Sequence, residues 1–382
     1  MSARISRATL AIPAASIIAV AAALAGGRAQ SQLNFPPAEG PPTQTISSAG
    51  YLGREACAAC HPAQAKIIGS NSMARAMSPA EKSEILRAHP RLTFRKGPYT
   101  YLITPEGDHS NYRVTDGVHS ISERILWAFG LGSAGQTYVF LHNGEYYQSR
   151  VSFYNDTQSL DITLGLDVVP ASIEEAAGAV MSEDEERLCF GCHSTGAVSG
   201  NTMQIGRLTP GVTCEGCHGP GGRHVAAAQA GKNPNVEIFN PGSLSTGDLT
   251  RFCGSCHRTW EQVEMMHWSG ISTVRFQPYR LANSRCFDPD DRRISCLACH
   301  DPHETVRRDA AFYDAKCEAC HRASPDSAGA NDKPGERVAQ VCRVDTKNCI
   351  TCHMPKYSLP GAHFQFTDHE IRIARRDEPY PD

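Results

Sequence analysis

Seven copies of the pattern Cys-x-x-Cys-His are the part of this 382-residue chain best equipped for chemistry. Two thiols three positions apart lie on one turn of chain, so both can add to the vinyl groups of a single porphyrin. The imidazole that follows can then bind the iron as an axial ligand. The pattern therefore predicts seven covalently attached haem c groups, each with one iron. The predicted attachment residues are Cys57, Cys60, Cys189, Cys192, Cys214, Cys217, Cys253, Cys256, Cys296, Cys299, Cys317, Cys320, Cys349 and Cys352. The predicted proximal ligands are His61, His193, His218, His257, His300, His321 and His353.

Zinc sites and disulfides are the alternative uses of such cysteines. A zinc knuckle needs two Cys-x-x-Cys pairs per tetrahedral site, so seven pairs leave one over. Zinc also gives no reason for a histidine directly after every pair. Sixteen cysteines in 382 residues are too sparse for a small disulfide-stapled scaffold. Haem attachment is therefore the preferred interpretation.

The second axial ligand of each haem iron must be one of the residues left over after the proximal histidines are assigned. Nine histidines are left for seven haems, enough for every iron to have two imidazoles. A histidine close behind an attachment motif cannot easily turn back onto that haem, so we expect it to serve a neighbour. Each such histidine has the alternative of a solvated surface position, and Met73 has that of packing against a porphyrin. The candidate second ligands are His224, His303, His369, His363, His267, His142, His119 and Met73.

Six motifs fall between Cys189 and His353, and this crowding bears on the fold. Successive attachment sites in this stretch are 21 to 43 residues apart. So dense a set leaves no room for an ordinary core of sheets and helices, so the apolar interior must be largely porphyrin. Ser182 and Glu185 fit a capping box that starts a helix leading into Cys189. We expect a mostly irregular and α-helical multihaem cytochrome c fold, with short helices packed around stacked haems.

Residues 91–170 differ in kind, because no cysteine occurs between Cys60 and Cys189. Short runs of β-type residues alternate there with turn signals. Asn143-Gly144 between two alternating runs is a strong hairpin signal. We expect an inserted small antiparallel β-sheet of four to six strands.

The amino terminus has the pattern of an export signal. Arg4 and Arg7 precede an apolar run over residues 8–25, and Ala23-Leu24-Ala25 fits a cleavage site. The alternative is an uncleaved single-pass anchor. Export to the periplasm or the cell exterior agrees with haem attachment, which takes place outside the cytoplasm. Two cysteines outside the motifs, Cys286 and Cys342, are then candidates for a disulfide. The expected organisation is a signal peptide at 1–29, a disordered linker at 30–50, a first-haem segment at 51–80, a β-rich insert at 81–170 and a six-haem domain at 171–382.

The carboxy-terminal half resembles the multihaem cytochrome c superfamily. This superfamily includes the tetrahaem cytochrome of ammonia oxidisers, pentahaem nitrite reductase, hydroxylamine oxidoreductase and octahaem tetrathionate reductase. The segments that carry the resemblance are 211–221, 299–303, 352–356 and 366–369. Every motif here ends in histidine, whereas pentahaem nitrite reductases have lysine in the active-site motif. No residue matches the tyrosine that the hydroxylamine enzyme cross-links to its haem.

Two functions follow from the residues and the resemblance. The first is an exported electron carrier with mainly bis-histidine haems, which exchanges electrons with a membrane quinol oxidase or another cytochrome. The alternative is an oxidoreductase with one open haem that acts on nitrite, hydroxylamine or tetrathionate. A subunit of an extracellular filament is a third, weaker alternative. A net charge of −3 gives no sign of a nucleic-acid partner, while peripheral membrane association and oligomerisation stay open.

Overall fold

The computed structural model describes residues 50–321, 342, 344–375 and 378–381, all within one compact unit. The predicted signal peptide and all but residue 50 of the predicted linker lie outside the described residues. The expected boundaries of the haem-bearing segments and of the insert stay predictions. Among the helices of the described residues, none has the length and apolar character needed to span a bilayer.

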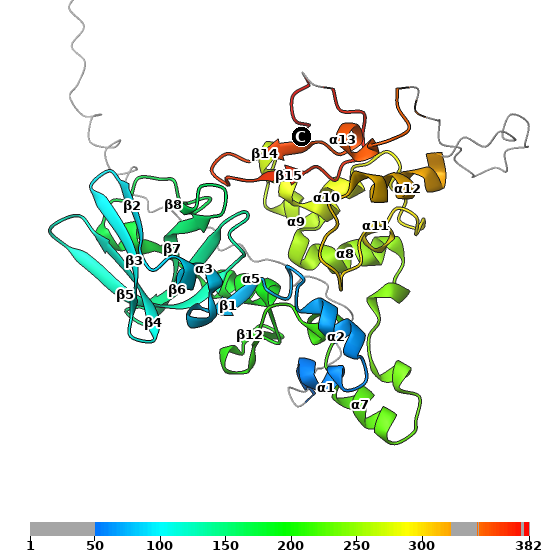
Figure 1. The fold of residues 1–382 in the computed structure, drawn as a ribbon, viewed down its shortest axis with the longest axis horizontal. Coiled ribbons are helices and arrows are strands. Elements are labelled where there is room, and N and C mark those ends of the chain that lie inside the picture. The colour runs from blue at the N-terminus through cyan, green and yellow to red at the C-terminus, as the bar shows by residue number, and fades with distance from the viewer. Residues whose placement is uncertain (1–49, 322–341, 343, 376–377, 382) are drawn as a thin grey trace, which may run out of the picture. The chain divides into compact units, whose positions relative to one another are not determined.

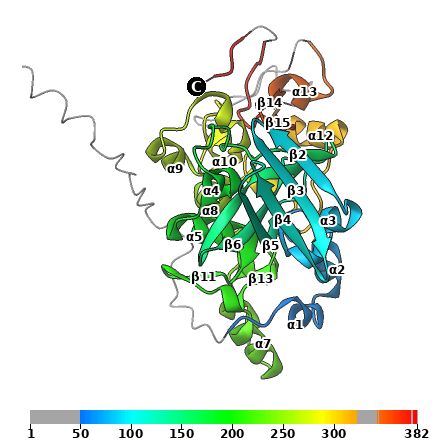
Figure 2. The ribbon, with the colours of Figure 1, turned by 90° about the vertical axis from the view of Figure 1, so that its left-hand side faces the viewer.

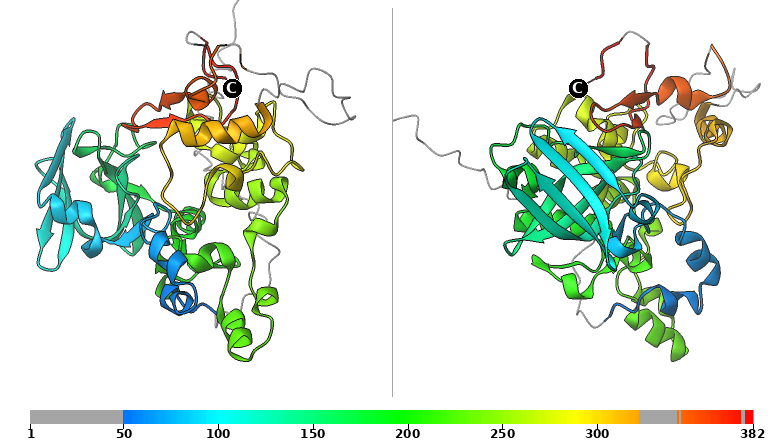
Figure 3. Two further views of the ribbon diagram at one scale, coloured as in Figure 1. Left: turned by 45° about the vertical axis from the view of Figure 1, so that its right-hand side comes forward. Right: turned by 60° about the vertical axis from the view of Figure 1, so that its left-hand side comes forward.

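A nine-stranded antiparallel sheet is the largest regular element (Figures 1 and 2). Its main path follows chain order from β2 to β8, and the two ends of this path lie against each other. The sheet is therefore nearly closed, and its curl is visible in both views of Figure 3. β1 adds to β5, and β9 adds to β7. The strands are β1 (Met77–Pro79), β2 (Leu92–Lys96), β3 (Tyr99–Glu106), β4 (His109–Thr115), β5 (Ser120–Phe129), β6 (Gln136–His142), β7 (Glu145–Tyr154), β8 (Ser159–Ile162) and β9 (Gly178–Val180).

The expectation of a mostly irregular and helical fold with a small inserted sheet is wrong, because this sheet is large and nearly closed. β5 is hard to recognise in the sequence, because Glu123 and Arg124 interrupt its apolar alternation and a register shift between Ile125 and Trp127 breaks the two-residue period. β1 and β9 have three residues each, too few to carry a pattern. The hairpin at Asn143-Gly144 is confirmed, with φ values of 53° and 87°.

The sheet has a core of its own side chains. Tyr101, Tyr112 and Phe140 are almost completely buried inside it. The short helix α4 (Ile173–Ala177) packs its alanines on the same core, and Tyr112 donates a hydrogen bond to the Ala177 carbonyl at 2.9 Å. A second apolar cluster joins Phe129 of β5 to Phe190, where the two rings meet edge to face at 5.1 Å.

The haem motifs lie among short helices and loops, with little apolar core between them. One small cluster, around Val263, Phe276 and Tyr279, is buried there. The helices are α1 (Arg54–Ala58), α2 (Pro62–Ile68), α3 (Glu84–Ala88), α5 (Glu183–His193), α6 (Cys214–His218), α7 (Gly222–Gln229), α8 (Thr246–His257), α9 (Trp260–Met265), α10 (Gln277–Ala282), α11 (Cys296–Cys299), α12 (Ala310–His321) and α13 (Cys349–His353). Short 3-10 turns are η1 (Ala80–Lys82), η2 (Ile205–Arg207), η3 (Pro234–Glu237), η4 (Pro241–Ser243) and η5 (Gly270–Arg275). Three two-stranded pairs join β10 (Ser194–Thr195) to β13 (Thr209–Pro210), β11 (Val198–Ser199) to β12 (Thr202–Met203), and β14 (Lys356–Ser358) to β15 (Gln365–Thr367).

Candidate haem-binding cavity

Six of the attachment motifs either end a helix or make up a helix of their own. The motifs close α5, α8 and α12, and they form almost all of α6, α11 and α13. The predicted capping box at α5 is confirmed, because Ser182 and Glu185 each accept a hydrogen bond from the other's backbone N–H. Ser245 and Ser295 cap α8 and α11 more simply, because each side chain accepts one backbone N–H of its helix without a reciprocal bond. These caps fix the turn on which each pair of thiols is presented.

A continuous cavity of about 4490 Å³ runs through the region of the motifs. Pockets for a single small ligand are usually about 300–1,000 Å³. All the cysteines and histidines of five motifs, at 57–61, 189–193, 214–218, 253–257 and 296–300, line this cavity. Lys316 and Ile350, which belong to the helices of the last two motifs, line it as well. The predicted attachment residues therefore surround one shared cavity. The cavity is large enough for several porphyrins, so the residues present fit these groups.

Three of the predicted proximal histidines face a second imidazole across this cavity. The ring centroids are 6.2 Å apart for His61 and His224, 6.2 Å for His218 and His303, and 6.3 Å for His300 and His369. A metal–imidazole bond is about 2 Å, so two imidazoles on opposite sides of one metal ion have ring centres about 6 Å apart. The three pairs are therefore spaced as two axial ligands of one iron would be.

The second nitrogen of several of these rings is held by a backbone carbonyl. A carbonyl oxygen can only accept, so Nδ1–H is the donor in each of these contacts. The lone pair of Nε2 is then left to bind a metal. Burial lowers the pKa of His193, His257 and His300, and lowers that of His369 to about 4. The neutral, ligating form is favoured at all four. The Nδ1 contacts are His193 to Ala76 at 3.0 Å, His218 to Phe239 at 2.9 Å, His224 to Pro234 at 2.9 Å, His353 to Arg372 at 2.9 Å and His369 to Thr367 at 3.0 Å.

Thiols of different motifs lie in contact with one another. A hydrogen bond with Cys256, together with burial, raises the pKa of the Cys192 thiol. A hydrogen bond with Cys296, again with burial, raises that of Cys253. The α8 motif therefore touches both the α5 motif and the α11 motif.

The same contacts extend to both ends of the series. Burial, with the Cys214 thiol adding to it, raises the pKa of Cys57 to about 11. Burial, followed by Asp314 and Cys317, raises that of Cys349 to about 12. Burial, followed by the nearby Cys256, also raises the pKa of Cys217, and burial, followed by Cys317, raises that of Cys299. The motifs consequently form a series in space, 57–214–253–296–317–349, and the motif at 189 branches from the one at 253.

Four of the nine spare histidines line the cavity: His224, His303, His363 and His369. In His363, however, Nε2 contacts the Asp161 carboxylate at 2.8 Å. Met73 also lines the cavity, whereas Met77 packs in the apolar cluster with Phe129.

The structure places the remaining spare histidines away from the cavity wall. His142 contacts Glu123 at 2.8 Å, and His119 and His109 contact aspartates beside them in turns. His267 is not part of the cavity wall, and His89 packs edge-on against Phe153. Of these residues, His119 and His267 are exposed, as the surface alternative describes, whereas His89 and His142 are partly buried against the sheet.

Known proteins resemble parts of this arrangement. The family model of cytochrome c554 and c-prime matches residues 155–219, which include the motifs at 189 and 214. The multiheme cytochrome MtrA of Shewanella baltica (strain OS185) is 24% identical over 153 residues, 39% of this chain and 37% of that protein. The chain is a multihaem c-type cytochrome. It spans little more than a third of the length of this curated relative. The crystal structure of the outer cell wall cytochrome OcwA covers 84% of this chain and 79% of its own, at 14% identity and a TM-score of 0.47, which does not establish a common fold.

Buried carboxylates tie the motifs of this cytochrome to one another. Glu215, inside the α6 motif, accepts backbone hydrogen bonds from Leu52 at 2.9 Å and Gly53 at 2.8 Å, just before α1. Asp314 of α12 accepts from the backbone of Asn348 at 2.7 Å and of Cys349 at 2.8 Å, at the start of α13. The sequence interpretation did not single out either residue. The one signal available was an acidic residue within or three positions before an attachment motif.

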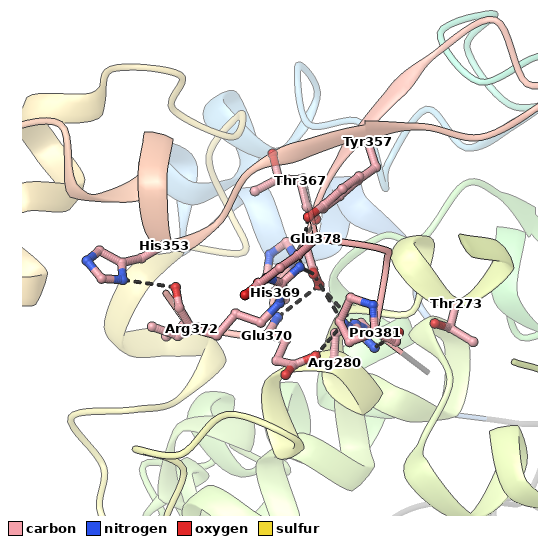
Figure 4. Close-up of polar contacts among 12 residues, drawn as sticks. Thr273, Arg280, His353, Tyr357, Thr367, His369, Glu370, Arg372, Glu378 and Pro381 are labelled. Atoms are coloured by element: carbon pink, nitrogen blue, oxygen red, sulfur yellow. Dashed lines mark hydrogen bonds and ion pairs between the residues drawn. The ribbon is translucent and has the colours of Figure 1, made fainter. Parts of the chain in front are cut away.

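A buried ion pair holds the segment that carries His369 (Figure 4). Arg280 of α10 donates from Nε to Asp368 at 2.9 Å and from a terminal nitrogen to the same carboxylate at 3.1 Å. It also pairs with Glu370, and both Arg280 and Asp368 are fully buried. His369 lies between these two acids, so the ion pair fixes the backbone from which its imidazole enters the cavity.

The two cysteines outside the motifs are not joined to each other in the structure. No disulfide involves Cys286 or Cys342, and Cys286 lies close to Cys317 of α12. The disulfide considered from the sequence is therefore not present.

Proposed function

We propose that this cytochrome carries electrons along seven covalently attached haems c, each held by one Cys-x-x-Cys-His motif. The proposal extends to all fourteen attachment cysteines and to the seven proximal histidines. Iron in such groups cycles between ferric and ferrous states, and that is the chemistry that the bound groups supply.

The contact between thiols of neighbouring motifs is the observation that carries this proposal. Each cysteine that holds a porphyrin is bonded to its edge, so cysteines that touch bring the groups that they hold next to each other. Cys192 touches Cys256, and Cys253 touches Cys296. A carrier needs such a series, whereas an enzyme with isolated haems does not.

The three imidazole pairs support bis-histidine ligation in part of the series. We assign His224 as second ligand opposite His61, His303 opposite His218, and His369 opposite His300. In each pair the spare histidine comes from a different part of the chain than the motif that it serves. These ligands thereby brace one attachment segment against another, as expected for a histidine that cannot turn back onto its own motif.

The partners and the location follow from the chemistry of attachment. Haem is attached to reduced Cys-x-x-Cys-His motifs outside the cytoplasm, so we propose export to the periplasm or cell exterior. The apolar run behind Arg4 and Arg7 is the sequence feature that supports export. Donor and acceptor would be other redox proteins, such as a membrane quinol oxidase or a second cytochrome, bound through small transient interfaces.

Removal of single haems tests the proposal. In the exported protein, intact mass should show seven attached haems. Replacement of Cys253 and Cys256 by alanine removes the haem at the branch point, and Cys57→Ala with Cys60→Ala removes one at the end. When a light flash reduces a haem at one end of the series, we expect electron transfer from that haem to the haems at the other end to be at least tenfold slower in the variant without Cys253 and Cys256 than in the unmodified protein.

The end variant is the matched control, because it also loses one haem but leaves the series unbroken. Its internal transfer among the remaining six haems should keep the rate of the unmodified protein. Equal rates in the two variants would contradict a series through the motif at 253, and fewer than seven haems in the unmodified protein would contradict the count.

A second candidate function is an oxidoreductase with one open haem at the motif at 189. The observation that favours it is that the ring against His193 belongs to Phe129, with centroids 5.4 Å apart, and phenylalanine cannot ligate iron. Carbon monoxide binding to one ferrous haem, followed by turnover of nitrite or hydroxylamine, would support this function. If carbon monoxide binds no haem, the oxidoreductase is excluded.

A further inference from the structure

Two arginines and two aromatic rings form part of the cavity wall beside α8. The Arg258 guanidinium lies 5.6 Å from the Trp268 ring centroid, and Arg275 lies 5.3 Å from that of Phe276. The two aromatic rings stack on each other at 4.8 Å with 27° between their planes. An arginine stacked on a ring keeps its N–H donors free at the edge of the guanidinium plane, where a carboxylate or oxyanion can bind. All four residues line the cavity.

Neither guanidinium has a carboxylate partner among the described residues. The ion pairs found there engage other arginines, such as Arg251 with Asp248 and Arg280 with Asp368. Arg275 also has a buried Nε without any hydrogen-bond acceptor. Burial, followed by the nearby Arg258 charge, lowers the pKa of Arg275. Both arginines are half-buried, and two guanidinium charges side by side without a carboxylate favour the binding of an anion between them.

The two arginines lie next to a predicted proximal ligand. Arg258 follows His257 directly in the chain, and the side chain of Gln277, two residues after Arg275, makes a hydrogen bond with His257. The two guanidinium groups therefore lie beside the branch-point motif.

We propose that Arg258 and Arg275 form a binding site for a carboxylate or small oxyanion beside His257. Two sources can supply such an anion. One is a propionate side chain of a haem held at the motif at 189 or 253, which rests on the proposed haem attachment. The other is a free anion from solution that reaches the cavity.

Anion titration of the haem-loaded protein separates the two sources. Sodium nitrite is the probe, followed by calorimetry and by the Soret band. The variants are R258Q, R275Q and the double variant. R251Q is the control, because Arg251 lies on α8, which ends directly before Arg258, but is exposed and paired with Asp248. A haemochrome assay first confirms equal haem content, so a failure of haem attachment is distinguishable from a failure of this site.

Each result decides the proposal. Saturable nitrite binding that weakens at least tenfold in the double variant, and not in R251Q, supports a site for a free anion. No nitrite binding, with a resonance Raman propionate band that shifts in the double variant alone, supports a propionate partner. If nitrite does not bind and the propionate bands of all variants match the unmodified protein, the site does not exist.

Discussion

Tyr112 and Phe140 have no exposed surface inside the curled sheet, whereas His61 and His224 face each other across an open cavity of about 4490 Å³. The sheet fills its interior with its own aromatic and β-branched side chains. The motif region instead leaves space of the size that several porphyrins need, and buried carboxylates such as Glu215 and Asp314 join its segments to one another. The difference indicates that the sheet can fold by its own apolar burial, while the motif region depends on its bound groups.

The largest expected effect comes from preventing haem attachment. In a chain with all fourteen motif cysteines replaced by serine, the amides of α8 to α13 should exchange with solvent freely. Those of β3 to β7 should stay protected, because the larger core cluster of the sheet contains no part of a motif, and the motif at 189 reaches only the smaller cluster around Phe129. Hydrogen exchange followed by mass spectrometry measures both regions in one sample. Equal protection in the two regions would show that the motif region needs no cofactor to fold.

The apolar core of the sheet should respond strongly to one cavity-creating change. Phe140→Ala should destabilise the sheet by about 3–5 kcal/mol, as large-to-small changes of buried aromatic residues do. The neighbouring Leu141, which is 39% exposed, provides the control Leu141→Ala. The haem absorption spectrum should not change in either variant. A changed spectrum in Phe140→Ala would mean that the two regions are not separate in their stability.

The motif region should depend instead on buried charge. Asp368→Asn leaves Arg280 without its bidentate partner, which costs about 3 kcal/mol when such a buried pair is broken. This cost lies at the low end of the range for broken buried ion pairs, because Glu370 still pairs with Arg280. Denaturation followed at the Soret band measures the loss, and Asp291→Asn, which breaks an exposed pair with Arg293, should change stability by about 1 kcal/mol or less. Adding Arg280→Met to Asp368→Asn should restore part of the stability, and no recovery would contradict the role of the buried charge.

The sequence predicted the features that depend on local spacing. The cap at Ser182 and the hairpin at Asn143-Gly144, both confirmed, follow from residues within a few positions of one another, and the seven predicted attachment motifs rest on the same kind of local pattern. The large sheet was underestimated, because β5 mixes charged residues with a bulge and β1 and β9 are very short.

The geometry of the site could be predicted only in part. His224, His303 and His369 were expected to serve a haem other than the one just before them, but sequence spacing does not tell which imidazole lies opposite which. Glu215 and Arg258 could not be found, because an acid that binds distant backbone amides and an arginine that stacks on a tryptophan have no periodic pattern. Such contacts depend on where loops meet in space.

The spin state of the haem irons in four single variants tests the proposed ligation most directly. We predict that His224→Ala, His303→Ala and His369→Ala each add one high-spin ferric haem to the electron paramagnetic resonance spectrum of the exported protein. His267→Ala should add none, because that residue does not line the cavity. If all four spectra match that of the unmodified protein, the three imidazole pairs do not hold iron, and the proposed arrangement of haems in the cavity is wrong.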